Sequence, residues 1–430
     1  MRVLAGKAAE KAVAELEHRA SRLDEIEPGV RRIVQTVRRG GDKALLRYAT
    51  LWDGLQKGQP MRVSDDEIAD AWRSTPRETR DALRRAAANI RRFCQWQMPR
   101  EWRRQVHGGE LGQMVRPLES VGCYVPGGRY PLPSTLLMTA IPAQVAGVPR
   151  ICVVSPRPQP ATLAAASLLG ISEVYRCGGA QAVAALAYGT QTIQRVDKIV
   201  GPGNVFVTAA KKLVSFDCAI DMLAGPTEAV VYSDGGNAEF VASDLVAQAE
   251  HDPDAVVVFI TTKSQFAGEV KSALAIAARD NTVARQSIRR NAALLVASSL
   301  EQAMEWVNRI APEHLTIDDA GELSQVHNAG SVFVGDYSPQ SAGDYAAGPN
   351  HVLPTAGVAR FRGGLSVYDF LKIITVQQFN VEGLRNIAPV ITTLAETEGL
   401  RAHAESVRVR CEGPRQALPL RLAGSRCVDA

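Results

Sequence analysis

Residues 150–204 read RICVVSPRPQPATLAAASLLGISEVYRCGGAQAVAALAYGTQTIQRVDKIVGPGN. Short β-rich runs alternate here with alanine-rich stretches of helical character. The β-rich runs are 150–156, 173–179 and 197–204, and the helical stretches are 164–170 and 180–189. Because parallel strands must be joined by crossover connections, which are usually helices, this alternation predicts a parallel sheet covered by helices.

The sequence on either side extends this pattern. Residues 1–118 show apolar residues at helical spacing, so we expect an N-terminal helical region. Further along, a second round of strands and helices includes AVVYSD, AVVVFITT, ALLVASS, HLTIDD and SVFVGDY. We therefore predict two α/β domains in tandem, residues 119–223 and 224–365. The second domain closes with a glycine- and proline-rich loop, 337–364, and residues 366–430 read as a C-terminal helical extension.

The composition is that of an ordinary folded protein. The 430 residues are 46% hydrophobic and 22% charged, which argues against large-scale disorder. A net charge of +4 is small for this length, so nucleic-acid binding is not expected. The first residues lack a secretory signal and no run of about 18 apolar residues occurs, so we expect a cytoplasmic protein without a membrane span. Seven cysteines without a CxxC motif read as reduced thiols.

Polar residues that suit metal binding and acid/base chemistry occur as close pairs in the second half of the chain. The pairs are Gln248 and His251, Glu313 and His314, Asp344 and His351, and Glu398 and His403. Together they have the composition of a hydrated metal site with its own acid/base groups. Each pair alone is more often a solvent-facing or structural feature, so no single pair predicts a site.

The positions of two pairs indicate how they would act. Gln248 and His251 lie three residues apart on an expected helix that Pro253 terminates, so an amide oxygen and an imidazole could share one cation. Glu313 and His314 stand at the entrance of the strand-like HLTI. Adjacent residues of an extended chain point to opposite sides, so we expect these two groups to act on different parts of a substrate or on a water molecule.

The other two pairs lie in different surroundings. The turn-rich loop GDYAAGPNHVLPT could fix Asp344 as a hard oxygen ligand and His351 as a second donor. Glu398 and His403 are five residues apart on an expected helix and do not share one stripe of it. Their joint use would need a site approached from the helix end, for example on a partner subunit.

Two glycine-rich turns could hold phosphates with their backbone N–H groups. They are VPGGRYPLPST at 125–135 and KIVGPGN at 198–204. Neither has the spacing GxGxxG, and such turns between strand and helix are common. By themselves they do not predict a dinucleotide site.

Long motifs occur along nearly the whole chain. In chain order they are VGCYVPGGRYPLPSTLLM, CGGAQAVAALAYGT, KIVGPGNVFVTAAK, DMLAGPTE, EFVASDLVAQAEHDPD, APEHL, GDYAAGPNHVLPT, LSVYDFLK and EGLRAHAESVRVR. Together these motifs resemble the histidinol dehydrogenase family. The resemblance implies an α/β fold with two tandem incomplete Rossmann-like parallel-sheet domains and N- and C-terminal helical extensions. It also implies a Zn2+-dependent enzyme that oxidises L-histidinol to L-histidine in two hydride transfers to NAD.

The resemblance implies roles for residues of this sequence. Zinc ligands match Gln248, His251, Asp344 and His403, and the acid/base pair matches Glu313 and His314. Substrate contacts match Thr227, His351 and Glu398, together with the zinc ligands and Glu313. Contacts to NAD match Tyr124, Gln181 and Asn204. Family members are intertwined homodimers in which the C-terminal segment reaches the site of the other subunit.

Three other functions fit parts of the pattern. A related zinc- and NAD-dependent dehydrogenase could act on a different small alcohol, such as a sulfonated diol, although Glu398 and His351 suit a cationic amine and an imidazole. A zinc hydrolase could use Glu313 to activate water. A catalytically inactive binding protein is disfavoured because every matched ligand and acid/base position is filled.

Overall fold

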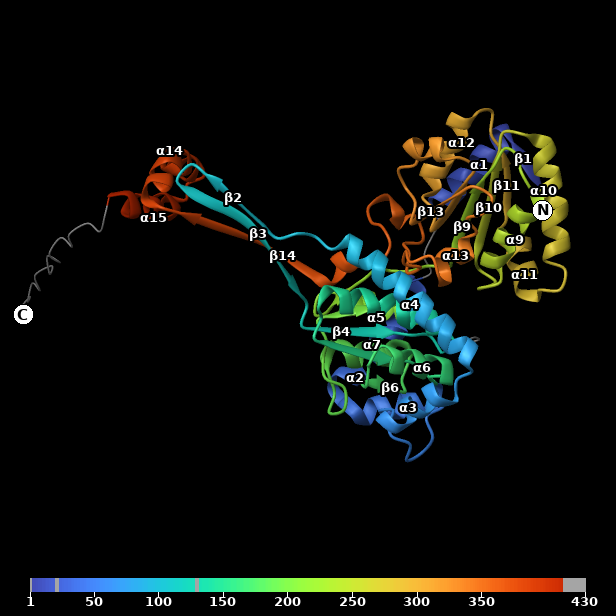
Figure 1. Cartoon of the computed structure of the whole chain (residues 1–430), viewed down its shortest axis with the longest axis horizontal. Helices are drawn as coiled ribbons and strands as arrows, with labels where there is room; N and C mark the ends of the chain where they lie inside the picture. Colours follow the sequence, from blue (N-terminus) through green and yellow to red (C-terminus); the bar gives the residue numbers. More distant parts are fainter. Residues whose placement is uncertain (1, 20–22, 128–130, 413–430) are drawn as a thin grey trace, which may run out of the picture. The chain divides into compact units, whose positions relative to one another are not determined.

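The computed structural model describes residues 2–19, 23–127 and 131–412. These residues form two compact units (Figure 1). The first unit consists of residues up to Met98 together with Pro117–Leu371, and the second consists of Pro99–Arg116 together with the residues from Lys372 onward. In the described part of the first unit, the strands form two parallel sheets with helices around them, which confirms the predicted α/β fold. The domain boundaries at residues 118, 223 and 365 stay predictions.

The first sheet is built around residues 150–204. Over the described residues its strand order is β6-β5-β4-β7-β8, and every pair is parallel. The strands are β4 (Ser120–Tyr124), β5 (Arg150–Val154), β6 (Val174–Tyr175), β7 (Lys198–Val200) and β8 (Ala219–Ile220). The chain moves outward from β4 in one direction through β5 and β6, and in the other through β7 and β8. The carboxyl ends of β4 and β7 therefore mark the switch point at which such sheets bind ligands.

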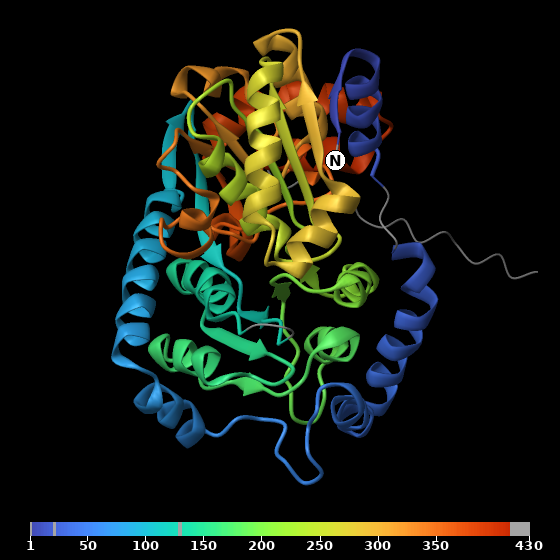
Figure 2. The same cartoon turned by 90° about the vertical axis from the view of Figure 1, so that its right-hand side faces the viewer.

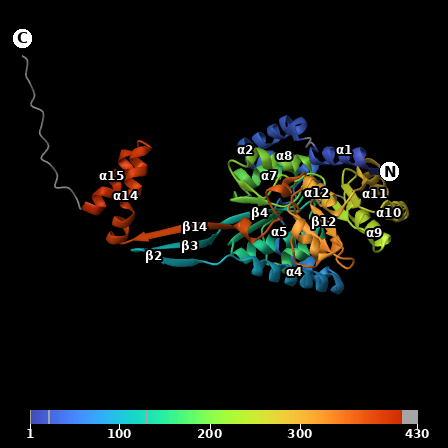
Figure 3. The same ribbon diagram turned by 90° about the horizontal axis from the view of Figure 1, so that it is seen from above.

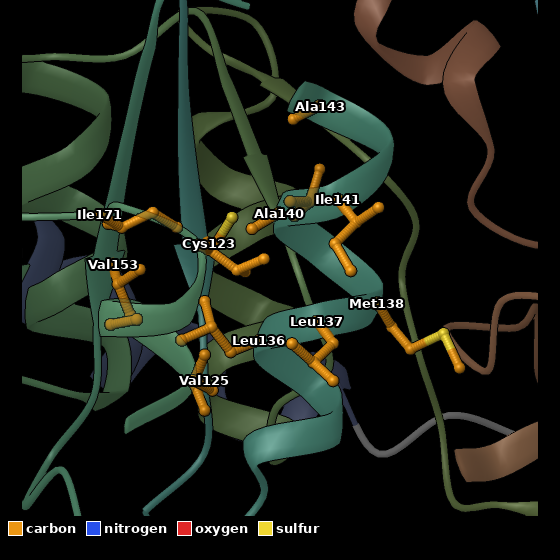
Figure 4. Close-up of a cluster of buried hydrophobic side chains, with 14 of the residues drawn as sticks. Cys123, Val125, Leu136, Leu137, Met138, Ala140, Ile141, Ala143, Val153 and Ile171 are labelled. Atoms are coloured by element: carbon orange, nitrogen blue, oxygen red, sulfur yellow. The ribbon is translucent and has the colours of Figure 1, made fainter. Parts of the chain in front are cut away.

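Each face of this sheet packs against its own set of helices, because successive strand residues point to opposite faces. Cys123 belongs to a core formed with α3 (Asp65–Ser74), α4 (Arg77–Gln97), α5 (Pro133–Ala146) and α6 (Pro160–Leu168). Tyr124 belongs to the core on the other face, formed with α2 (Leu23–Trp52), α7 (Gly179–Tyr188) and α8 (Val205–Val214). Figures 2 and 3 show α2 and α4 on opposite sides of β4, and Figure 4 shows Cys123 and Val125 beside Leu136 of α5.

The second sheet contains the strands of the predicted acid/base region. Over the described residues its order is β1-β11-β10-β9-β12-β13, and every pair is parallel. The strands are β1 (Val3–Ala5), β9 (Glu228–Tyr232), β10 (Val256–Thr261), β11 (Ala293–Val296), β12 (His314–Ile317) and β13 (Ser331–Val334). One face packs against α1 (Gly6–Glu17) and α12 (Leu300–Ile310), and the other packs against α9 (Ala238–Ala249), α10 (Ser264–Ala277) and α11 (Thr282–Asn291).

Short helical elements follow the second sheet. They are η1 (Ala320–Gln325), α13 (Gln340–Tyr345), η2 (Val358–Arg360) and η3 (Val367–Phe370). The segment 337–364, which we expected to be an irregular loop, therefore contains one short α-helix and one 3-10 turn. This matters for the site because Asp344 lies on α13 and not in a turn.

The second unit contains strands that the sequence did not predict. Its sheet has the order β14-β3-β2, formed by β2 (Trp102–Val106), β3 (Gly109–Pro117) and β14 (Leu371–Phe379), and it is followed by α14 (Val381–Thr397) and α15 (Arg401–Glu412). The prediction of helix at 102–117 and at 371–379 is wrong. Every residue of β2 is exposed, so the alternating burial that identifies a strand is missing there. These strands pair with partners that are remote in sequence.

Two further expectations concern the whole chain. Among the described residues, no helix is both long enough and apolar enough to cross a membrane. The six described cysteines are free thiols, as expected, while Cys427 lies outside the described residues. Burial raises the pKa of Cys123 to about 12, so this thiol is a poor nucleophile at neutral pH.

Candidate active site

The predicted acid/base pair lies at the amino end of β12. Helix α12 ends at Ile310, and Ala311 caps it with a left-handed backbone, φ 50°. The chain then bends at Glu313 and enters the strand at His314. Both side chains are buried, with Glu313 7% exposed and His314 3% exposed.

Glu313 and His314 face the same neighbourhood, which differs from our expectation of opposite directions. Glu313 Oε2 lies 3.7 Å from His314 Nδ1. The expectation is wrong because Glu313 occupies a bend before the strand and does not follow the alternation of strand residues. A carboxyl group and an imidazole therefore share one small buried volume.

The carboxylate of Glu313 is held by residues at the start of β9. Its Oε2 accepts a hydrogen bond from Thr227 Oγ1 at 2.6 Å and another from the backbone N–H of Glu228 at 2.9 Å. Burial raises the pKa of Glu313 to about 7, although His314 and these hydrogen bonds oppose the rise. A carboxyl group with this pKa can gain or lose a proton near neutral pH.

The imidazole of His314 lies between a backbone carbonyl and a carboxylate. Its Nδ1 is 3.4 Å from the carbonyl oxygen of Glu228, and its Nε2 is 3.3 Å from Asp344 Oδ1. The ring stacks on Phe333 with a centroid distance of 6.0 Å. Burial disfavours the imidazolium, but the carboxylates of Glu313 and Asp344 outweigh it and raise the pKa of His314.

Asp344 joins three of the predicted site residues. Its Oδ1 faces His314, its Oδ2 accepts a hydrogen bond from Gln248 Nε2 at 3.2 Å, and its backbone oxygen accepts one from His351 Nδ1 at 2.8 Å. Burial acts to raise the pKa of Asp344, but the imidazoles of His314, His351 and His251 outweigh it, so the pKa is lowered. Burial lowers the pKa of His351, which favours its neutral form.

The other predicted donors of the first unit, Gln248 and His251, lie at and just beyond the C-terminal end of helix α9. Gln248 is buried in its last turn, and its Oε1 lies 3.4 Å from Thr227 Oγ1. His251 is exposed and lies beyond the helix, which ends at Ala249, so the prediction that both residues are helical is wrong for His251. Among the described residues, no group of three or more His, Cys, Asp or Glu side chains is arranged as a metal site.

The loop after α13 is anchored to helices of the first sheet. Asn89 of α4 donates a side-chain hydrogen bond to the backbone oxygen of Ala346 at 2.9 Å. Asn350 donates one to the backbone oxygen of Met138, on α5, at 2.6 Å. These bonds fix the segment between Asp344 and His351, so the positions of both depend on the helices that cover the first sheet.

The residues expected to contact NAD lie at the carboxyl edge of the first sheet. Tyr124 ends β4, Gln181 lies in the first turn of α7, and Asn204 caps α8. The backbone N–H of Gly179 donates to the Tyr124 hydroxyl at 3.0 Å. The Gln181 side chain donates to Asp53 at 3.0 Å. Their common position is the edge at which doubly wound sheets bind nucleotides.

Glu398 and His403 lie exposed in the second unit. We expected one helix to contain both. Instead Glu398 caps α14, a turn follows at Gly399 with φ 77°, and His403 lies on α15. The two helices pack on each other.

Three acidic residues near these sites were missed by the sequence analysis. Glu228 and Asp53 are buried, and Asp244 is half-buried. Glu228 follows Thr227 directly and contacts both Glu313 and His314 through its backbone. Asp53 accepts hydrogen bonds from the backbone of Gly178 and from Gln181, at 3.0 Å each. Asp244 lies one helical turn before Gln248, and burial together with Asp344 raises its pKa to about 6. Only Asp244 had a sequence signal, its spacing of four residues from Gln248 on one helix.

Comparison with known proteins identifies the family. The model of the family described as "Histidinol dehydrogenase" matches residues 16–411. A histidinol dehydrogenase of Methanothermobacter thermautotrophicus is 47% identical over 415 residues, covering 93% of this chain and 97% of that protein. One from Geobacter sulfurreducens is 46% identical over 401 residues, covering 90% of this chain and 93% of that protein.

A solved structure agrees with this result. The crystal structure of histidinol dehydrogenase from Elizabethkingia anophelis superimposes with a TM-score of 0.91 at 36% identity, covering 96% of this chain and 98% of that chain. The sequence and the fold thus point to the same relatives along almost their full lengths. The chain belongs to the histidinol dehydrogenase family.

Proposed function

We propose that this chain is a histidinol dehydrogenase, which oxidises L-histidinol through histidinal to L-histidine with two NAD in the last steps of histidine biosynthesis. The observation that supports this most is the buried contact of His314 with Glu313 and Asp344. Two successive oxidations need a base for the alcohol proton and a base for water, and this contact supplies both. We propose that the protein acts in the cytoplasm.

In the first oxidation, His314 accepts the hydroxyl proton as hydride leaves the alcohol carbon for NAD. A backbone carbonyl can only accept hydrogen bonds, so the contact of Nδ1 with the Glu228 oxygen favours the ring that is protonated at Nδ1. Nε2 is then the basic nitrogen. The carboxylates of Asp344 and Glu313 stabilise the imidazolium that forms.

In the second oxidation, Glu313 removes a proton from the water that attacks the aldehyde carbon. Loss of hydride from the resulting gem-diol to a second NAD, and of one hydroxyl proton to solvent, leaves the carboxylic acid, which ionises to the carboxylate. The elevated pKa of Glu313 makes it a stronger base than an ordinary carboxylate once it is ionised.

The rate of histidinal oxidation is expected to rise as the pH increases through about 7. Glu313 must be ionised to act as a base, and its pKa in the folded chain is raised to about 7. Below that pH most of the carboxyl groups are protonated, and above it most are ionised. Initial rates of NADH formation from histidinal between pH 5.5 and 8.5 measure this, and the Glu313→Gln variant serves as the control. A limb near pH 7 that persists in Glu313→Gln would contradict the assignment.

We propose that Zn2+ is held by Gln248, His251 and Asp344, with His403 from a second copy of the chain. Support comes from the first unit, in which Gln248 and Asp344 are in contact and the charge of His251 lowers the pKa of Asp344. An amide oxygen, a carboxylate and an imidazole are donors that zinc accepts. When bound, the cation would polarise the substrate oxygen.

We also propose the remaining contacts from the family resemblance. His351 and Thr227, with Glu398 from a second copy, would bind histidinol, and Tyr124, Gln181 and Asn204 would contact NAD. The chain would then work as a homodimer. His351 suits this role because its Nδ1 is engaged by Asp344 and its Nε2 is left to meet the substrate.

A metal-stripped and zinc-reconstituted preparation tests the function directly. With histidinol and NAD we expect two NADH for each histidine formed. NADH from another amino or sulfonate alcohol but not from histidinol would favour a related dehydrogenase, and hydrolysis without any need for NAD would favour a zinc hydrolase. Either outcome would contradict the proposed function.

A further inference from the structure

Glu228 contacts both members of the acid/base pair through its backbone. Its N–H donates to Glu313 Oε2 at 2.9 Å, and its carbonyl oxygen lies 3.4 Å from His314 Nδ1. A shift of the Glu228 backbone would therefore displace the donor to Glu313 and the acceptor beside His314 at the same time. The Glu228 side chain has no part in the mechanism proposed above, and yet it is buried.

The carboxylate of Glu228 is paired with Arg19, which follows α1 near the start of the chain. Arg19 Nε and Nη2 donate to the two carboxylate oxygens, so the guanidinium and the carboxylate form two parallel hydrogen bonds. The side chains are 16% and 4% exposed, respectively. Burial raises the pKa of Glu228, and the charge of Arg19 opposes this rise.

The same ion pair also makes hydrogen bonds to two segments that flank the site, the end of α12 and the loop after His351. Arg19 Nη1 donates to the backbone oxygen of Ile310 at 3.1 Å, at the end of the helix that leads into Glu313. The Glu228 carboxylate accepts a hydrogen bond from the N–H of Ala356, which lies 2.9 Å from Oε1. Ala356 has a φ of 54°, which a non-glycine residue rarely adopts, and it lies in the loop that follows His351.

We propose that the Arg19–Glu228 ion pair positions the acid/base pair, so that the N-terminal segment sets the rate of both oxidations. Arg19 and Glu228 are positioning residues: they touch neither substrate nor cofactor, and they act through the Glu228 backbone. The proposal rests on the proposed function of Glu313 and His314. Arg19, which follows α1 and is remote from the site in sequence, would thus affect kcat without forming part of the binding site.

The Arg19→Ala variant tests this proposal. We expect kcat for histidinol and for histidinal to fall about 10–100-fold, because small displacements of reacting groups have effects of this size. KM for histidinol should change by less than about threefold, since no substrate contact is removed. Guanidinium chloride at a non-denaturing concentration should restore part of kcat by entering the space that the side chain leaves. The Arg19→Lys variant keeps the charge but loses the paired donors. Its kcat should lie between that of the wild-type chain and that of Arg19→Ala.

Arg309→Ala is the matched control. Arg309 also joins the N-terminal segment to α12, through ion pairs with Glu10 and Glu17, but it does not touch Glu228. This variant should lower the melting temperature, and it should leave kcat unchanged in the presence and absence of guanidinium. Arg19→Lys keeps the test decisive if Arg19→Ala does not fold.

The possible outcomes separate this inference from the function on which it rests. A wild-type chain that forms no NADH from histidinol would overturn the proposed function and this inference with it. An active wild type whose Arg19→Ala and Arg19→Lys variants retain kcat within about twofold would overturn this inference alone. A kcat of Arg309→Ala that falls and is then restored by guanidinium, as in Arg19→Ala, would also overturn it, because the effect would not be specific to the Arg19–Glu228 ion pair.

Discussion

The His314→Ala variant is expected to oxidise histidinol about 10²–10⁴-fold more slowly than the wild-type chain. His314 is the one imidazole in contact with Glu313, Asp344 and the Glu228 carbonyl among the residues that the structure describes. Alanine removes the group that accepts the alcohol proton, and none of these neighbours lies in its place. The first NADH formed in a single turnover of histidinol measures the first oxidation.

The Glu313→Gln variant is expected to lose mainly the second oxidation, that of histidinal. Glutamine keeps an oxygen that can accept from Thr227 and from the Glu228 N–H, so the local packing should persist. It cannot remove a proton from water. Oxidation of histidinal should therefore fall by about 10²–10⁴-fold, while oxidation of histidinol should fall much less.

An exposed histidine provides the control for both variants. His327 lies on the surface, where its backbone N–H bonds to Asn308, and no site residue contacts it. His327→Ala should retain both rates. Equal loss of the two half-reactions in Glu313→Gln would contradict the separate roles that we assign to Glu313 and His314.

Replacing Asp221 by asparagine is expected to lower the free energy of unfolding by about 3–5 kcal/mol, because it leaves a buried lysine without its counter-charge. The side chains of Lys211 and Asp221 form an ion pair and are 3% and 0% exposed. The pair also holds the turn before Asn204. Asp221 Oδ2 accepts a hydrogen bond from the N–H of Gly201 at 2.7 Å, and Lys211 Nζ donates one to the carbonyl oxygen of Gly201 at 3.0 Å.

Glycine is required at position 201 in this turn. Gly201 has a φ of 114°, and a Cβ there would lie 2.2 Å from the backbone oxygen of Tyr124. The turn therefore lies directly against the end of β4. Loss of the ion pair would loosen the turn between β7 and α8, where the sequence resemblance places an NAD contact.

Urea unfolding at one fixed protein concentration measures this prediction. Asp70→Asn is the control, because Asp70 and its partner Arg73 are exposed, and such pairs contribute about 0–1 kcal/mol. The double variant Lys211→Met with Asp221→Asn removes both charges and should be more stable than Asp221→Asn alone. Equal unfolding free energies for Asp221→Asn and Asp70→Asn would disprove the prediction.

The predicted fold was most accurate where burial leaves a periodic pattern in the sequence. The runs that became β5, β6 and β7 are buried on both faces and lie between alanine-rich helices, so their alternation was visible. The segments that became β2 and β14 are mostly exposed and showed no such pattern. The three residues of β1 are too few to show any period. These strands depend on neighbours that come from distant parts of the chain.

For the candidate site, the residue types were predictable and their partners were not. Local motifs and a family resemblance were enough to single out Glu313, His314 and Asp344. The contact of Asp344 with His314 and Gln248 depends on α13 packing beside α9 and β12, which no local spacing encodes. Glu228 and Arg19 were overlooked because an isolated glutamate and an isolated arginine have no distinguishing pattern.

Sequence alone therefore fixed the α/β class, the parallel sheets and the family, because side-chain volume and polarity follow the period of each buried helix or strand. It could not give the bend that turns Glu313 toward His314, or the pairing of Arg19 with a residue 209 positions away. Such contacts arise when strands from separate regions become neighbours. Strand order is set by the packing of the whole sheet and not by any single segment.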